Sequence, residues 1–350
     1  MKTTFYFLSL LALGVLGSCG RSDTSIITDK GVYILNEGAF GRKNASLSLF
    51  NPTTRTVENQ VFYKANNNQP LGDVGQSVSE VNGNLYMVMN TSNYVQIMNL
   101  STRVQAGRIE GLNQPRYLHS LSNNTAYISE WGADGLTGTV ALVDLNSKTI
   151  TSRISTEPGP EQMAKIGNNV YVACTGGYGD ASKLQIIDVT DNTAKGVIEL
   201  GTNAPFAVAA KNTDLWVYCA GKYDYTNNRT SQKARLIKIN TTDNSIAKNI
   251  ELTDAAFSSS DELVLSLDGL TLYYTLNGNL YAMNTISFIP TLLVKDKSIT
   301  AVALGNSNTL YLGSTPNYTT AGTFLRYTTS GTGIDSTTVG IAPGAIYIKN

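Results

Sequence analysis

The strongest constraint on the fold of this chain is a segment that recurs seven times, at intervals of about forty-five residues. Each copy is a short apolar run with an aromatic side chain at its third position. These aromatic residues are Tyr33, Tyr86, Tyr127, Tyr171, Trp216, Tyr273 and Tyr311. A loop and a second apolar run follow each copy, and then a turn rich in Thr, Ser and Asn leads to a third run. We interpret each unit as one sheet of a repeat architecture.

Four strands per unit at this period are typical of a β-propeller blade. We call the strands a to d, from the central channel outwards. The first unit begins at Gly31 with a b strand, and a matching a strand is found only at the other end, over Gly344 to Lys349. The sequence therefore predicts an all-β, seven-bladed β-propeller over residues 31–350, with four antiparallel strands per blade. The C-terminal strand completes the first blade and leaves no open sheet edge. A β-sandwich or an irregular solenoid is the alternative, and we find no helical periodicity after residue 30.

Composition narrows the class of protein. The chain has 350 residues, of which 42% are hydrophobic, so it can bury a sizeable core. Charged residues make up 15%, with 26 Lys and Arg against 26 Asp and Glu. A nucleic-acid-binding protein usually carries a basic excess, so we expect no nucleic-acid partner. We also expect a monomeric propeller.

The N-terminal segment predicts export and a lipid anchor. Lys2 precedes an apolar run from Phe5 to Gly17, which is short for a permanent membrane-spanning helix. The run ends in Leu16-Gly17-Ser18-Cys19, which resembles the bacterial lipobox. That resemblance implies cleavage before Cys19, lipidation of its thiol and anchoring in the outer membrane. We therefore assign residues 1–18 to a signal peptide and 19–30 to a tether; an ordinary secretory signal is the alternative.

No catalytic constellation is evident in the sequence. The single histidine, His119, cannot supply a multi-histidine metal site, and no zinc-protease, nucleophile-elbow or phosphate-loop motif is present. We therefore expect no enzyme activity, no resident cofactor and no metal. Cys174 and Cys219 each lie three residues after the aromatic of their unit. Because equivalent positions lie on different sheets, about 10 Å apart, we expect two buried free thiols, although an exported protein could pair them.

The candidate binding surface is the propeller face that carries the b–c loops and the d–a loops. The b–c loops are long and hold large side chains, whereas the c–d turns of the opposite face are short and polar. Aromatic rings interleaved with Arg and Asn suit a flat or bulky amphipathic ligand. The candidate ligand-binding residues are Phe40, Arg42, Arg116, Trp131, Tyr178, Phe206, Tyr223, Tyr225 and Tyr318. The alternative is that these are solvated loops with incidental aromatics. The seven b-strand aromatics are expected in the core between blades.

Two segments carry a family resemblance. Val32-Tyr33-Ile34-Leu35-Asn36-Glu37-Gly38, with Phe40-Gly41 and Asn44-x-Ser46-Leu47-Ser48 behind it, resembles the opening of YVTN/DUF5074-type surface propellers. The later segment from Pro70 to Ser77 fits the same group. These are lipoproteins of gut Gram-negative bacteria, and among them are the BtuG-type cobalamin-binding proteins. The resemblance implies a cell-surface lipoprotein that captures cobalamin or another corrinoid as a transported ligand and passes it to a TonB-dependent transporter.

Three functional hypotheses follow. The first is capture of a bulky nutrient, such as a corrinoid, for a TonB-dependent transporter. The second is a propeller scaffold for protein–protein interaction at the cell envelope, without small-molecule binding. The third is a hydrolase or lyase on a propeller frame, which requires a pair of acidic residues across the channel.

Overall fold

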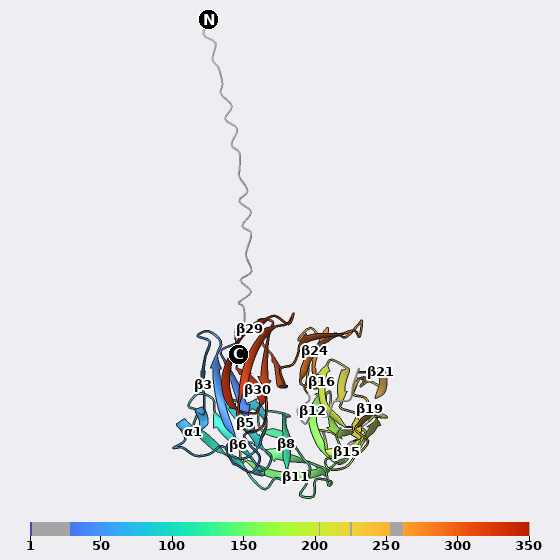
Figure 1. Ribbon diagram of the computed structural model, residues 1–350. Coiled ribbons are helices and arrows are strands. Elements are labelled where there is room, and N and C mark those ends of the chain that lie inside the picture. The colour runs from blue at the N-terminus through green and yellow to red at the C-terminus, as the bar shows by residue number, and fades with distance from the viewer. Residues whose placement is uncertain (2–28, 203, 225, 253–261, 350) are drawn as a thin grey trace.

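A computed structural model describes residues 29–202, 204–224, 226–252 and 262–349, together with Met1. These residues form a ring of seven antiparallel four-stranded sheets, which confirms the predicted seven-bladed propeller (Figure 1). The inner strands of successive blades lie beside one another around the ring. None of the helices within the described ranges is both long and apolar enough to cross a membrane. Cys19 and Tyr225 lie outside the described residues.

The first four blades are regular. From the channel outwards, blade 1 consists of β30 (Pro343–Lys349), β1 (Gly31–Asn36), β2 (Ser46–Asn51) and β3 (Thr56–Glu58). Blade 2 consists of β4 (Gly75–Val81), β5 (Asn84–Met89), β6 (Tyr94–Asn99) and β7 (Gln105–Ile109). Blade 3 consists of β8 (Pro115–Ser120), β9 (Thr125–Glu130), β10 (Thr139–Asp144) and β11 (Thr149–Ser155). Blade 4 consists of β12 (Pro160–Ile166), β13 (Asn169–Cys174), β14 (Lys183–Asp188) and β15 (Thr193–Glu199).

The last three blades repeat this order with one insertion. Blade 5 consists of β16 (Pro205–Lys211), β17 (Asp214–Cys219), β20 (Arg235–Asn240) and β21 (Ser245–Glu251). Its b–c loop forms a hairpin of β18 (Lys222–Asp224) and β19 (Arg229–Gln232). Blade 6 consists of β22 (Leu263–Leu265), β23 (Thr271–Leu276), β24 (Asn279–Asn284) and β25 (Pro290–Val294). Blade 7 consists of β26 (Ile299–Leu304), β27 (Thr309–Ser314), β28 (Ala321–Thr328) and β29 (Gly333–Ile341).

One helix departs from the sequence prediction. Helix α1 (Val61–Ala65) occupies part of the connection from blade 1 to blade 2, where the sequence predicts no helix. Its Val61 and Phe62 are buried in the core cluster of these blades. Five residues are too few to show a helical period, so packing of these two side chains, rather than periodicity, determines the helix.

The ring is closed by the pairing of strands from the two ends of the chain. β1 and β30 are antiparallel, with Tyr33 opposite Tyr347 and Ile34 opposite Ile346. The Lys30 amide extends the ladder by donating to the Lys349 carbonyl at 2.7 Å. Asp29, which the sequence assigns to the tether together with Lys30, accepts a hydrogen bond of 2.7 Å from the Tyr311 hydroxyl of blade 7. The two ends of the chain therefore form one sheet, and that sheet is bonded to blade 7.

The recurring aromatics lie between blades, as predicted. All seven are 5% exposed or less. The Tyr127 hydroxyl donates to Asn192 at 2.6 Å, and the Tyr171 hydroxyl donates to Asn244 at 2.9 Å. Both Asn residues lie in the c–d turn of the next blade, so these two tyrosines connect blade 3 to blade 4 and blade 4 to blade 5. Cys174 and Cys219 are buried and unpaired, as the sequence predicts.

Candidate functional site

The core of the candidate site is an ion pair between two inner strands. Arg116 is the second residue of β8, and Glu161 is the second residue of the neighbouring β12. The Arg116 Nε atom lies 3.0 Å from both carboxylate oxygens of Glu161. The Arg116 side chain is 9% exposed and that of Glu161 is fully buried. Burial raises the pKa of Glu161, while hydrogen bonds from Arg116 and Trp131 to its charged form oppose the shift.

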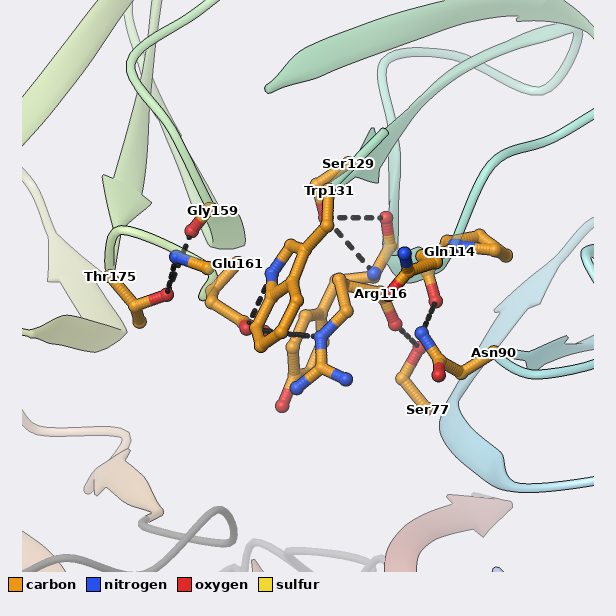
Figure 2. Close-up of polar contacts among 12 residues, drawn as sticks. Ser77, Asn90, Gln114, Arg116, Ser129, Trp131, Gly159, Glu161 and Thr175 are labelled. Atoms are coloured by element: carbon orange, nitrogen blue, oxygen red, sulfur yellow. Dashed lines mark hydrogen bonds and ion pairs between the residues drawn. The ribbon is translucent and has the colours of Figure 1, made fainter. Parts of the chain in front are cut away.

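Trp131 covers this ion pair. It follows β9 directly, and its indole Nε1 donates to Glu161 Oε1 at 2.9 Å. The Arg116 guanidinium carbon lies 4.5 Å from the centroid of the Trp131 ring, within the range of a cation–π contact. Figure 2 shows Trp131 and Arg116 converging on the Glu161 carboxylate. The three side chains therefore fix one another in a single arrangement.

The two terminal nitrogens of Arg116 are not used by this arrangement. Among the described residues, the side-chain hydrogen bonds of Arg116 all start from Nε (Figure 2). Arg116 as a whole is only 7% exposed. Neither Nη atom is among the buried side-chain atoms that lack a hydrogen-bond partner, so in the described part of the chain both reach solvent. The Nη atoms of Arg116 are therefore the polar groups at this site that are available to an acceptor from outside the fold.

Tyr178 extends the site outwards from Trp131. Its ring meets the Trp131 ring edge to face, at 5.6 Å and 87°. Its hydroxyl donates to Gln114 Oε1 at 3.0 Å and its amide donates to the Gly135 carbonyl at 3.0 Å. Gly135 has φ of 69°, and a Cβ atom there would lie 2.1 Å from the Tyr178 ring. Glycine at position 135 thus allows the b–c loops of blades 3 and 4 to pack together and hold Tyr178 in place, with 69% of Tyr178 exposed.

On the channel side, Tyr117 and Phe206 border the site. Their rings contact edge to face, with centroids 6.4 Å apart. Burial raises the pKa of the Tyr117 hydroxyl, and the charges of Glu262 and Glu161 raise it further. Tyr117 is therefore neutral at physiological pH.

Glu37, in the b–c loop of blade 1, adds a titratable group near Arg116. Burial raises its pKa to about 7, although the Arg116 charge acts in the opposite direction. Its carboxylate lies against the closing strand, because a Cβ atom on Gly344 would be 2.3 Å from Glu37 Oε1. Within the described ranges, no group of three or more His, Cys, Asp or Glu side chains could hold a metal ion.

The structure brings together only some of the residues predicted from the sequence. Arg116, Trp131 and Tyr178 form one cluster. Phe206 is 7% exposed and belongs to the core cluster of blades 5 and 6.

The remaining candidates lie on loops outside that cluster. Phe40 and Arg42 are exposed in blade 1, and Tyr318 is 46% exposed in blade 7. Tyr223 lies in β18, where its hydroxyl donates to Asn228 at 2.6 Å.

The sequence places Glu161 at the start of an inner strand on the binding face, but it does not select Glu161, Gln114 or Glu37 as ligand-binding residues. A usable signal for Glu161 exists, since Arg116 and Glu161 are 45 residues apart, which is one repeat, and each follows a proline that begins an inner strand. Phe206 follows Pro205 in the same way. The repeat thus places Arg116, Glu161 and Phe206 at one level around the channel, but the sequence does not show that Arg116 and Glu161 pair.

Comparison with known proteins agrees with this architecture. The family model described as "Domain of unknown function (DUF5074)" matches residues 30–287. No curated protein matches the chain.

Several solved structures share the fold at low sequence identity. A quinonprotein alcohol dehydrogenase-like protein from Bacteroides thetaiotaomicron is 16% identical with a TM-score of 0.69, covering 92% of this chain and 79% of that one. A functionally unknown protein from Desulfotomaculum acetoxidans is 12% identical with a TM-score of 0.67, covering 92% and 99%. Hydrazine synthase from Kuenenia stuttgartiensis is 15% identical with a TM-score of 0.65, covering 78% and 92%. At these identities the likeness concerns the fold alone.

Removing the Glu161 carboxylate should destabilise the ring strongly. In Glu161→Ala, Arg116 becomes a buried charge without its counter-ion, and we expect a loss of about 3–5 kcal/mol in the free energy of unfolding, measured with urea. The double variant Arg116→Met/Glu161→Ala is the control and should recover much of that loss. Equal losses in the single and double variants would contradict the role of the ion pair.

Glu37 should make stability depend on pH. Its pKa is about 7 in the fold and 4.5 when unperturbed, so the folded state holds the proton more tightly. This contribution to stability is complete below pH 4.5 and is lost as the pH rises through 7. Glu37→Gln should therefore gain stability relative to the wild-type protein between pH 5 and pH 8, by on the order of 1 kcal/mol. Thermal unfolding at both pH values measures the difference, and a difference independent of pH would show that Glu37 does not titrate in this range.

Proposed function

The chain belongs to the DUF5074 family, and from this premise we propose that it is a ligand-capture protein that binds without catalysis. The binding surface is the loop face around Arg116, Trp131 and Tyr178. The observation that carries the proposal is that Glu161 and Trp131 hold Arg116 in place while its two terminal nitrogens, within the described residues, make no hydrogen bond and stay open to solvent. A ligand that supplies an acceptor therefore meets a pair of donors that is already oriented.

The geometry favours a large ligand with an apolar body and polar edges. Tyr178 offers an exposed ring, and Trp131 is only partly buried beside it. The packed loops hold both rings before the ligand arrives, which reduces the entropy lost on binding. The Nη atoms of Arg116 can donate to a carbonyl or carboxylate oxygen, and the Glu37 carboxyl beside them can accept from an N–H group. A ring system with peripheral amide groups matches this pattern, and the finer proposal is therefore cobalamin or another corrinoid.

The cellular setting follows from the N-terminal sequence. We propose that Cys19 carries the lipid anchor, that the propeller is displayed on the outer-membrane surface and that the ligand passes to a TonB-dependent transporter. The support for this part is the Leu16-Gly17-Ser18-Cys19 sequence together with the resemblance to surface propellers. A scaffold that binds only a protein partner is the competing function.

Calorimetric titration of the chain from Gly20 onwards with cyanocobalamin and cobinamide tests the proposal. We expect binding that Trp131→Ala and Tyr178→Ala each weaken by at least about tenfold, because aromatic anchors dominate such contacts. Tyr63→Ala removes a tyrosine that is 40% exposed on α1, away from the site, and should bind as the wild-type protein does.

Two results would contradict parts of this account. Absence of heat with both corrinoids would reject the corrinoid proposal. Capture of an envelope protein by a chain that binds neither corrinoid would favour the scaffold.

A further inference from the structure

The face opposite the candidate site carries the a–b turns, the c–d turns and both ends of the ring. This follows from the strand order, because the chain enters β1 and leaves β30 at the end of blade 1 where an a–b turn would lie. Each c–d turn can be numbered from the last residue of its c strand, and the third residue can then be compared between blades. In six blades it is polar: Thr53, Ser101, Asn146, Thr190, Thr242 and Ser330. In blade 6 it is Ile286.

Blade 6 concentrates apolar side chains at this face. Leu267 is 82% exposed, Ile286 72% and Ile289 67%. We define the blade 6 apolar patch as Leu267, Leu270, Ile286, Ile289 and Leu292, each of which is at least 44% exposed. Its two turns are bonded together, because Thr285 donates from its amide to the Leu270 carbonyl at 2.9 Å and from its hydroxyl to the Gly269 carbonyl at 2.9 Å. These bonds join the two turns of blade 6 that carry Leu267, Leu270, Ile286 and Ile289.

Packing within the fold accounts for one apolar residue of this turn but not for the others. Phe288 packs against Trp216 of blade 5, with ring centroids 6.2 Å apart. It holds the turn position at which Asn192 and Asn244 accept the tyrosine hydroxyls of their preceding blades. Because tryptophan has no hydroxyl, an aromatic partner replaces the amide there. Ile286 and Ile289 point to solvent, so burial does not explain them.

The charged groups around the patch suit an interface with lipid headgroups. The Lys248 ammonium lies 5.2 Å from the centroid of the Phe288 ring. The Lys211 ammonium donates to the Leu267 carbonyl. The one acidic group within the turns, Asp268, accepts hydrogen bonds from Ser266 and the Leu270 amide and so is engaged locally. Lysines beside exposed leucine and isoleucine are typical of surfaces that lie at a bilayer boundary.

We propose that the blade 6 apolar patch docks on a lipid bilayer, with Leu267, Ile286 and Ile289 entering the headgroup boundary. A bilayer is the expected partner of the patch because the chain enters the ring at this face. The inference rests on the proposed anchor at Cys19, which precedes Asp29 by ten residues. Ten residues span at most about 33–36 Å, so the anchored membrane lies within reach of this face. A second, weak contact holds the propeller with this face on the membrane while it captures ligand, and delivery to the transporter requires this contact to be released so that the loop face can turn.

Vesicle flotation tests the patch separately from the anchor. Every strand that the structure describes begins at or after Gly31, so the chain from Gly20 contains all seven described sheets but lacks Cys19. We expect this chain to float with vesicles of phosphatidylethanolamine and phosphatidylglycerol. Leu267→Ser/Ile286→Ser/Ile289→Ser should reduce the bound fraction by about tenfold. Val197→Ser, which removes a valine that is 39% exposed on the outer strand β15, is the matched control and should bind normally.

Fluorescent labelling provides a second readout that does not depend on folding changes. The native Cys174 and Cys219 are buried, so a single Ile286→Cys can be labelled with an environment-sensitive dye. Its emission should shift to the blue with vesicles, and that of Val197→Cys should not. Equal flotation of the wild-type protein and the triple variant, or dimerisation through the patch in solution, would overturn the proposal. Failure of Cys19 lipidation, detected by mass spectrometry of the membrane-extracted protein, would instead reject the anchor and leave the vesicle result intact.

Discussion

The pairing of β1 with β30 is the interaction on which the rest of the structure depends. It joins the two ends of the chain in one sheet and supplies the inner strand of blade 1. β30 also lies beside β26 and β4, the inner strands of its neighbouring blades. Loss of this one strand would expose the edge of β1 and open the ring between blades 7 and 2. The closing strand therefore gives the channel its continuous wall.

The candidate site is a consequence of that closed ring. Arg116, Glu161 and Phe206 occupy the same position in three successive inner strands, so the ring sets their spacing. The long b–c loops then place Trp131 and Tyr178 above them. Glu37 connects the site to the closure itself, because its carboxylate lies against Gly344 of β30 and is sensitive to the Arg116 charge. Ring closure and site geometry are thus properties of the same set of contacts.

Much of the fold follows from the sequence, and the reasons are physical. A repeated aromatic and a repeated turn are local signals. For most of the b and c strands, they predict both ends to within one residue. The missing inner strand was identified because a sheet edge needs a partner. Helix α1 was not predicted, because five residues carry no period, and the β18–β19 hairpin was not predicted, because its strands are short and polar.

The site was harder to predict than the fold. Arg116, Trp131 and Tyr178 were selected as large polar or aromatic residues on the face that carries the b–c loops. Glu161, which fixes two of them, is one repeat away and is fully buried, and composition does not reveal such a pairing. Exposure was also not readable from sequence, since Phe206 lies in the core while Phe40 is 80% exposed. These differences depend on how neighbouring blades pack, which is decided by contacts far apart in the chain.

Cross-linking of the two chain ends tests the ring closure most directly. Ile34 and Ile346 lie opposite each other in the β1–β30 ladder, whereas Ile348 is displaced by two residues. In a full chain with Cys19 replaced by Ser, the Ile34→Cys/Ile346→Cys pair should form a disulfide under mild oxidation, visible as faster migration on a non-reducing gel. The Ile34→Cys/Ile348→Cys pair should remain reduced. No cross-link in the first pair, or equal cross-linking in both, would contradict the closed ring.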